Sequence, residues 1–417
     1  MCRRLGQGPL RSHNHCNVFV QEKPNMQRRN FIRIAGGGAI FAATVATTGL
    51  AGCSEGMPPE AIEAWTGPGP DAAPERDLRR WLLSYAILAP HSHNLQSWVV
   101  DLGTPNEIVL RCDLTRLLPQ VDPLSRQIMM SHGTFLELLD LAARERGLRA
   151  DVALFPEGAF GPDKLDARPV ARIRLSPDAS VQKDPLFAQI LLRHTNRRAY
   201  DIARAVPAEA WAAMLAAVKP HPLRFGYAGL EQAEDLRIHR SIALEAWRIE
   251  LTTPRTIMES YAVLRVGAGE IAAHRDGLAL LDPMVLLLNR VGLFDRSKPP
   301  GPDDYATTSQ IKDFGKKLES TPGFLWMETE DNERVTQVNA GRAFARVQLA
   351  ATAQGLAMQP LSQALQEYPE QAATYARIHA LLQAPPPRYT VQMWARVGYA
   401  PPVPPAARRR LDDFIHV

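Results

Sequence analysis

Hydrophobic and polar residues follow one another along residues 75–180 in a pattern that predicts helices and strands in turn. Apolar residues recur at helical spacing from residue 75 to Pro90, and again on one face from residue 123 to about 147. Short, mostly apolar runs predict strands at residues 99–102, 108–112 and 171–175. This first unit therefore has the order helix, two strands, helix, strand.

A second unit begins near Pro185, with one helix into Arg193 and another from about Pro207. Its most regular elements are a strand at residues 323–328, a helix at 337–354 and a strand at 389–397. Residues 230–320 are helical and then loop-like, and the prolines of residues 298–302 interrupt any regular element there. An insertion of this size between core elements is usually a lid or a packing arm.

The N-terminal 52 residues have the pattern of an export signal. A basic stretch is followed by an uncharged run at residues 34–50 and by Leu-Ala-Gly-Cys, which ends at Cys53. Arg28 and Arg29, followed by Phe-Ile-Arg, resemble the twin-arginine export signal. The ending resembles a bacterial lipobox, which implies that Cys53 is acylated. The alternatives are cleavage nearby without a lipid, and a membrane-spanning anchor, for which the run is short and weakly apolar.

The start of the chain and the tether follow from the same region. Met26 is a better start for such a signal than Met1, because residues 1–25 show no periodicity. Residues 53–75 are rich in Pro, Gly, Ala and Glu and are typical of a tether. We expect a periplasmic lipoprotein that is exported in the folded state by the twin-arginine machinery and held to the membrane by its lipid.

The charge balance separates the signal from the mature chain. The whole sequence has 48 basic and 44 acidic residues, but residues 1–52 hold seven of the basic and only one of the acidic ones. The remainder is slightly acidic, so the surplus gives no support for nucleic-acid binding. The four cysteines, Cys2, Cys16, Cys53 and Cys112, lack the spacing of a metal site or a redox motif.

Three segments carry candidate chemistry. Pro-His-Ser-His-Asn-Leu-Gln-Ser-Trp, residues 90–98, places polar side chains between a helix end and a strand, where loops commonly bind ligands. A capping turn with a core tryptophan is the alternative, and a metal site at its His-x-His pair lacks further ligands nearby. Arg-His-Thr-Asn-Arg-Arg, residues 193–198, can grip a phosphate or be a solvated basic turn. Residues 408–410 are three further arginines.

Taken together, these segments resemble the nitroreductase family. Residues 193–200 resemble its opening FMN motif, and residues 90–98 are similar to its Pro-Ser-x-x-Asn-x-Gln-Pro-Trp segment. Further matches lie at residues 340–361, at the Arg-Val-Gly-Tyr of residues 396–399 and at the terminal arginines. The resemblance extends over most of residues 75–417.

The order of the motifs resembles that of the subgroup in which two half-copies are fused. In ordinary members the arginine motif comes first and the Pro-Ser-x-x-Asn segment follows, whereas here the second motif precedes the first by about a hundred residues. The resemblance implies an α+β, nitroreductase-like fold with antiparallel-rich sheets packed by helices. The halves would be residues 76–184 and 185–417, the latter with a lid at about 230–320. Such a monomer is an intrachain pseudo-dimer with one composite FMN site.

The resemblance also assigns roles to individual residues. Arg193, Thr195 and Arg197 would hold the phosphate, ribityl chain and pyrimidine edge of FMN. The other residues implied are His91, Ser92 and Asn94 from the first half, Pro360 and Leu361 along the isoalloxazine, and Arg408 and Arg409 at the phosphate. The family often has Glu-Gly beside flavin N5, where this sequence has Ser362 and Gln363.

The expected activity is that of an FMN-dependent oxidoreductase. Electrons would pass from NAD(P)H or another donor through FMN to an electron-poor small-molecule acceptor, so that no protein nucleophile or general base is needed. Because nicotinamide cofactors are scarce outside the cytoplasm, the alternative is a protein that binds and shields FMN under its lid without turnover.

Overall fold

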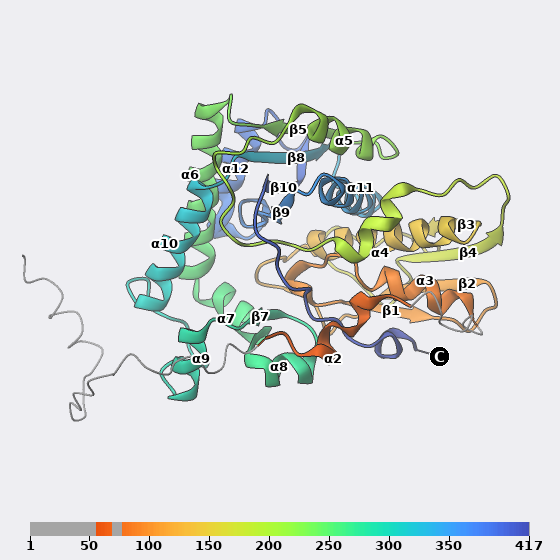
Figure 1. Ribbon diagram of the computed structural model, residues 1–417, viewed down its shortest axis with the longest axis horizontal. Coiled ribbons are helices and arrows are strands. Elements are labelled where there is room, and N and C mark those ends of the chain that lie inside the picture. Colours follow the sequence, from red (N-terminus) through yellow and green to blue (C-terminus); the bar gives the residue numbers. More distant parts are fainter. Residues whose placement is uncertain (1–55, 69–76, 417) are drawn as a thin grey trace, which may run out of the picture. The chain divides into compact units, whose positions relative to one another are not determined.

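Two antiparallel four-stranded sheets organise residues 56–68 and 77–416, the part of the chain that the computed structural model describes (Figure 1). The first sheet has the order β1-β2-β4-β3, with strands Trp98–Asp101, Glu107–Cys112, Ala171–Pro177 and Leu148–Leu154. The second has the order β5-β8-β10-β9, with strands Arg224–Ala228, Gly323–Thr329, Thr390–Gly398 and Ala357–Pro360. Each pairing in both sheets is antiparallel, and helices pack on both, so the fold is α+β as predicted.

Two long helices, α4 (Arg126–Glu145) and α11 (Arg334–Ala353), join the sheets by packing against each other. Glycines lie where the two backbones meet. A Cβ atom on Gly133 would stand 1.9 Å from the carbonyl oxygen of Val338, and one on Gly341 would stand 1.9 Å from that of Met130. Only a residue without a side chain permits such an approach. The close crossing of the two helices therefore depends on these glycines.

Apolar faces of the helices supply the cores. Helices α3 (Leu78–Ala86) and α4 cover the first sheet around Trp98 and Phe135. On the second sheet, α5 (Ala208–Val218) and α11 cover one face. Its other face is covered by α6 (Ala233–Thr252), α10 (Tyr305–Glu319) and α12 (Ala372–Leu381).

An edge strand of each sheet forms a bridge with a residue that is distant in the sequence. Ile415 lies in a parallel bridge beside Val100 of β1, and the N–H of His416 donates to the carbonyl of Val100 at 2.8 Å. In the same way Thr195 lies beside Met358 of β9, in a parallel bridge. Only the first of these bridges joins the two predicted halves, since Thr195 and Met358 both belong to residues 185–417. The descent of the two halves from one repeated unit stays a prediction.

The predicted insertion, residues 230–320, divides into two kinds of structure. Its first and last helices, α6 and α10, belong to the core of the second sheet. Between them lie α7, β6, α8, β7 and α9, which are Pro254–Ala262, Leu264–Val266, Gly267–His274, Leu278–Leu280 and Pro283–Arg290. This middle part touches the first sheet's loops: Glu259 accepts the N–H groups of Gln120 and Val121 at 2.9–3.1 Å, and Arg116 pairs with Asp276 at 2.5 Å. Its role as a lid stays a prediction.

The predicted elements match the observed ones with definite exceptions. The helix predicted from residue 123 begins at Arg126, because Ser125 has a left-handed backbone with φ 54°. Residues Pro185–Leu192 form a 3-10 helix, η3. Strands β3 and β5 were not predicted, since charged or small residues occupy many of their positions. Short helices complete the unit: α2 (Pro59–Ile62), η1 (Glu63–Thr66), η2 (Ser92–Asn94), η4 (Gln363–Leu365), η5 (Pro369–Gln371) and η6 (Leu411–Phe414).

Candidate functional site

The loop between α3 and β1, residues 90–98, is held in an uncommon backbone shape. The φ angles are 49° at His93, 54° at Asn94 and 55° at Gln96, in the left-handed region. Such conformations persist only where surrounding contacts determine them, and they cluster at functional sites. The N–H of Gly277 donates to the carbonyl of Asn94 at 3.1 Å, and the N–H of Arg409 donates to Oε1 of Gln96 at 2.9 Å. Two distant parts of the chain thus fix this loop.

His91 and Ser92 are held by the first sheet's core. Nε2 of His91 lies 2.7 Å from the hydroxyl of Ser97, and its ring meets that of Trp98 edge-on at 5.1 Å. Burial lowers the pKa of His91 to about 3, so the ring is neutral at physiological pH. The N–H of Ser92 donates to the hydroxyl of Ser131 on α4 at 3.1 Å. His91 therefore contributes shape and hydrogen bonding rather than charge.

Two arginines from the two other motifs meet at the C-terminus of α3. Arg193 donates to the carbonyl of Leu88 at 2.8 Å, and Arg408 donates to the same oxygen at 3.1 Å. Both guanidinium groups also lie against the ring of Trp65, at 5.5 and 5.0 Å from its centroid. Cations are favourable at this end of a helix because its last carbonyls carry partial negative charge. The two arginines thus join three segments that are far apart in sequence.

Arg408 donates all of its guanidinium hydrogen bonds to other residues of the protein. Its five N–H groups reach the carbonyls of Ile87, Leu88, Ala89 and Ala407 and Oδ1 of Asn94, the last at 2.5 Å. The side chain is buried, and burial first and the charge of Arg193 next lower its pKa. In this arrangement Arg408 fixes Asn94 and the end of α3. It keeps no donor for a ligand.

Arg409 also braces the loop. Its guanidinium donates to the carbonyl of Asp413 at 2.8 Å and lies over the ring of Phe414 at 4.6 Å. Together with its backbone bond to Gln96, these contacts tie the C-terminal segment to residues 90–98. Both terminal arginines of the predicted site therefore act here on the shape of the loop.

Arg197 and Lys317 differ from these arginines, because neither side chain makes a hydrogen bond or an ion pair with any described residue. Solvent reaches Arg197, yet the surrounding protein is dense enough that burial lowers its pKa. Burial, then Arg396 and Arg197, lower the pKa of Lys317 on α10, against the opposing effect of Asp313. Burial followed by the charge of Arg197 lowers the pKa of His93 to about 4. Arg197 is thus close enough to Lys317 and His93 for its charge to act on both. Uncompensated positive charge is what an anion site requires.

The remaining predicted residues lie along β9. Thr195 bridges to Met358 on that strand, and Pro360 ends it opposite Ala395 of β10. Leu361 is buried, and its N–H donates to the carbonyl of Trp394 at 2.8 Å. The side chain of Leu361 belongs to the core of the second sheet, whereas Pro360 keeps exposed surface.

Several buried polar atoms near these residues have no partner in the described part of the chain. They are Nε of Arg193, Nδ1 of His194, Nε2 of Gln348 and Nε2 of Gln127. Gln348 and Gln127 belong to this group through their neighbours: Gln348 accepts from Arg193 at 3.0 Å, and Gln127 accepts from the hydroxyl of Ser92 at 3.4 Å. A buried polar atom without a partner costs free energy, so a bound polar molecule would relieve this cost.

Sequence reasoning missed some of these residues, and one prediction lies outside the structure. Trp65, Lys317 and Gln127 have no motif around them, and Gln348 lies in the matching stretch at residues 340–361 but was not singled out, so only the fold brings them to the arginines. Cys53, the predicted acylation site, lies outside the described residues.

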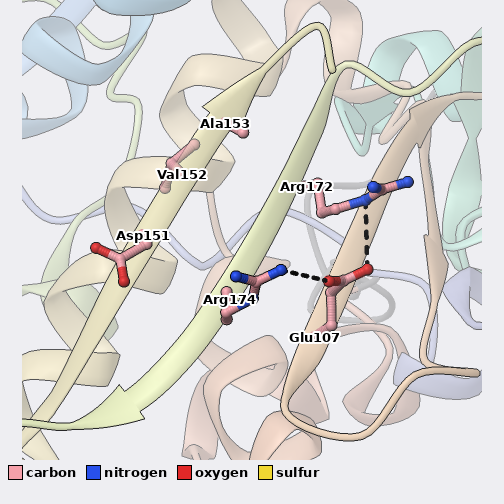
Figure 2. A pocket seen from close by; sticks show the side chains of 6 residues that line it. All are labelled: Glu107, Asp151, Val152, Ala153, Arg172 and Arg174. Atoms are coloured by element: carbon pink, nitrogen blue, oxygen red, sulfur yellow. Dashed lines mark ion pairs between the residues drawn. The ribbon is translucent and has the colours of Figure 1, made fainter. Parts of the chain in front are cut away.

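A hollow on the outer face of the first sheet is separate from these residues (Figure 2). Glu107 stands between Arg172 and Arg174, at 3.3 and 4.0 Å, and Asp151 lies on the neighbouring strand β3. None of the predicted cofactor residues lines it. Its charges compensate one another, so it is typical of a solvated sheet face. Residues 56–68 and 77–416 contain no cluster of three or more His, Cys, Asp or Glu arranged for a metal ion, and no helix there is long and apolar enough to cross a membrane.

Residues 308–399 match the model of the Nitroreductase family. Two relatives from Mycobacterium tuberculosis strain H37Rv align with most of the chain. "Putative NAD(P)H nitroreductase Rv3131" is 28% identical over 367 residues, covering 84% of this chain and 95% of its own. "Putative NAD(P)H nitroreductase acg" is 26% identical over 368 residues, covering 84% and 98%. The crystal structure of the FMN-dependent nitroreductase NfnB from Mycobacterium smegmatis in complex with NADPH aligns with a TM-score of 0.33 at 17% identity, over 51% of this chain and 86% of that one.

The family match covers β8, α11, β9 and β10, which include the helix that joins the two sheets. The relatives align with nearly their whole length. The chain is therefore similar to the Nitroreductase family at residues 308–399 and, over most of its length, to proteins named putative NAD(P)H nitroreductases.

Proposed function

We propose that this protein is a nitroreductase-like, FMN-dependent oxidoreductase with one composite flavin site. The observation that carries the proposal is the convergence of motifs a hundred residues apart: the loop at residues 90–98, the arginine motif and the terminal arginines meet at one helix end. The family match and the names of the relatives supply the chemical class.

The residues present fit a phosphorylated, polar cofactor. Arg197 and Lys317 offer charged side-chain donors that no described residue occupies with a hydrogen bond or ion pair, which suits the FMN phosphate. Nε of Arg193 and Nε2 of Gln127 are buried donors that lack acceptors. Thr195 and Pro360 lie on adjoining backbone at β9, on the path expected for the ribityl chain and the ring. When bound, FMN would supply the hydride and electron chemistry.

The protein's own residues would bind and orient. The loop at residues 90–98 is fixed by Arg408 and Arg409 before any ligand arrives, and this pre-organisation lowers the cost of binding. His91 stays neutral and adds no charge repulsion to the arginines. The middle of the insertion, which contacts this loop through Gly277, would exclude water. The acceptor would be an electron-poor small molecule and the donor NAD(P)H or another reductant.

A second candidate is a protein that binds and shields FMN without turnover. It is favoured by Ser362 and Gln363, which stand where nitroreductases often have Glu-Gly at N5; in this structure Gln363 opens the short helix η4. The test is to load the protein with FMN, add NADPH without oxygen and follow the visible absorbance of the flavin. Bleaching within seconds supports the oxidoreductase, persistent yellow colour supports the shielding protein, and a protein that takes up no FMN refutes both.

We also propose that the chain is exported by the twin-arginine route and anchored at Cys53 in the periplasm, and that it acts as a monomer. The N-terminal pattern supports this proposal. Replacing Arg28 and Arg29 by lysine should retain the protein in the cytoplasm, and Cys53→Ala should release it from membranes. Unchanged fractionation of both variants would contradict the proposed route and anchor.

A further inference from the structure

Helix α9 and the turn after it expose an apolar strip. The exposed fractions are 58% for Met284, 53% for Leu287, 58% for Val291 and 65% for Leu293. The first three are spaced by three and four residues and so share one helix face. The opposite side of the helix buries Leu286. Single exposed apolar residues are ordinary, but a strip of this kind marks an interaction surface.

Exposed hydrophobic residues are more frequent in this strip than on the rest of the described surface. Among the eleven large hydrophobic residues exposed in the described part of the chain, four lie within these ten residues. Charges around it are nearly balanced: Arg290, Arg296 and Lys298 stand against Asp282 and Asp295. Apolar burial, rather than attraction to a charged partner, is therefore the force available here.

The start of the mature chain lies beside this strip. Met57 and Ala61 pack in one cluster with Ile271 of α8 and with Leu281, which precedes Met284 by only three residues. Figure 1 draws α2, α8 and α9 along one edge of the unit. Cys53 precedes Met57 by four residues, so their Cα atoms are at most about 14 Å apart. A lipid on Cys53 would thus be joined by a short stretch of chain to Met57, which packs with Leu281 just before α9.

We propose that residues 284–293 are a membrane-docking surface that rests on the bilayer holding the lipid of Cys53. This inference rests on the proposed acylation. With eight residues, α9 is about 12 Å long and cannot span the bilayer, so it lies along the interface with its apolar side chains in the acyl region. An acyl anchor leaves a protein free to tumble, and a second contact fixes its orientation. The partner is a lipid surface, without need of a particular headgroup.

The test places a fluorescent probe on the strip and on a matched position elsewhere. Leu287→Cys is compared with Leu215→Cys, an exposed leucine of α5, in the exported chain, from which the proposed cleavage before Cys53 has removed Cys2 and Cys16. Cys112 is buried and stays unlabelled. In phosphatidylcholine vesicles with brominated acyl chains, we expect the probe at 287 to be quenched at least about threefold more than the probe at 215, because only the former would reach the acyl region. Equal quenching would overturn the proposal.

Two further measurements separate the possible failures. The mass of the N-terminal peptide reports whether Cys53 is acylated, and FMN uptake is measured independently, so loss of the anchor or of flavin binding is distinguished from failure of α9. Light scattering of the parent and of the Leu287→Glu, Val291→Glu double variant tests for a second copy on the strip. A dimer that this variant dissociates, without quenching at 287, would assign the strip to self-association and overturn the membrane proposal.

Discussion

Arg197→Ala should weaken FMN binding strongly without weakening the protein. The Arg197 guanidinium makes no hydrogen bond or ion pair with any residue in the described ranges, so its removal leaves no protein acceptor unsatisfied. It also lowers the pKa of Lys317, which means that the two positive charges repel in the absence of an anion. The apo-protein should therefore unfold at an unchanged or slightly higher temperature.

The magnitude for the ligand follows from the charge-assisted bond that would be lost. A hydrogen bond to a charged group contributes about 1.5–3 kcal/mol, which corresponds to a rise in the Kd for FMN of about 10- to 150-fold. Because solvent reaches Arg197, we expect the lower part of this range, and a loss that shrinks as salt is added. The assay is a titration of FMN fluorescence quenching at two ionic strengths.

The matched control is Arg198→Ala. Arg198 is the next residue and is exposed, and its contacts are made by its backbone: the N–H donates to Asn196 and the carbonyl accepts from Arg396. Its truncation should change the Kd less than about threefold, as expected for a solvated charge. If both variants bind FMN equally, or if Arg197→Ala lowers the free energy of unfolding by more than about 1 kcal/mol, the assignment of Arg197 to an anion site is wrong.

Other variants test the scaffold around the site. Arg408→Ala should destabilise the protein by about 3–5 kcal/mol in urea unfolding, because five bonds from a buried guanidinium disappear; a loss under about 1 kcal/mol would contradict its bracing role. Gly133→Ala should cost several kcal/mol by forcing α4 from α11, whereas Gly269→Ala, with open space around it, should be neutral or stabilising by up to about 1 kcal/mol; similar thermal shifts would refute the close crossing. Burial raises the pKa of Glu250 to about 7, so its contribution to stability is present below pH about 4.5 and is lost as pH rises to about 7; Glu250→Gln should flatten this part of the stability profile, and an unchanged slope would exclude Glu250 as its source.

Arg193→Ala is a less selective test of the flavin site. Its guanidinium donates to Leu88 and Gln348, so truncation is expected to weaken FMN binding and the helix end together. Burial lowers the pKa of Arg193 to about 10, but the group stays charged at neutral pH. Comparing its effect on the Kd with its effect on unfolding separates the two contributions, and unchanged FMN affinity would remove Arg193 from the phosphate site.

The elements that the sequence predicted well are those with strong periodicity. The strands at Trp98–Asp101, Glu107–Cys112 and Thr390–Gly398 and the helix Arg334–Ala353 lie close to their predicted bounds, because each has recurring apolar residues that are buried. Strand β3 was not predicted, because it alternates between half-buried and exposed residues, and its exposed positions carry Arg149 and Asp151. Helix α6 was placed in an insertion, although its apolar face belongs to a core that includes Phe324 and Trp394.

The candidate site divides in the same way. Motifs identified Arg193, Asn94 and Arg408 as members of one site, and the structure brings these three together. For Arg408 the contacts differ from the implied role at the phosphate, since its guanidinium donates to Asn94 and to backbone carbonyls. Lys317 could not have been foreseen, because a lysine in an amphipathic helix carries no local signal of what lies opposite.

The sequence alone therefore determined features that depend on local patterns. They are the signal-like pattern before Cys53, the order of the motifs, and the α+β alternation of helices and strands. Each of these depends on residues close together in the chain. The tertiary structure alone decided which arginines donate to helix carbonyls and which keep free donors, and it packed Met57 and Ala61 against Leu281, just before the apolar strip of α9. Hydrogen-bond satisfaction and burial depend on neighbours hundreds of residues away, and only the packed fold supplies those neighbours.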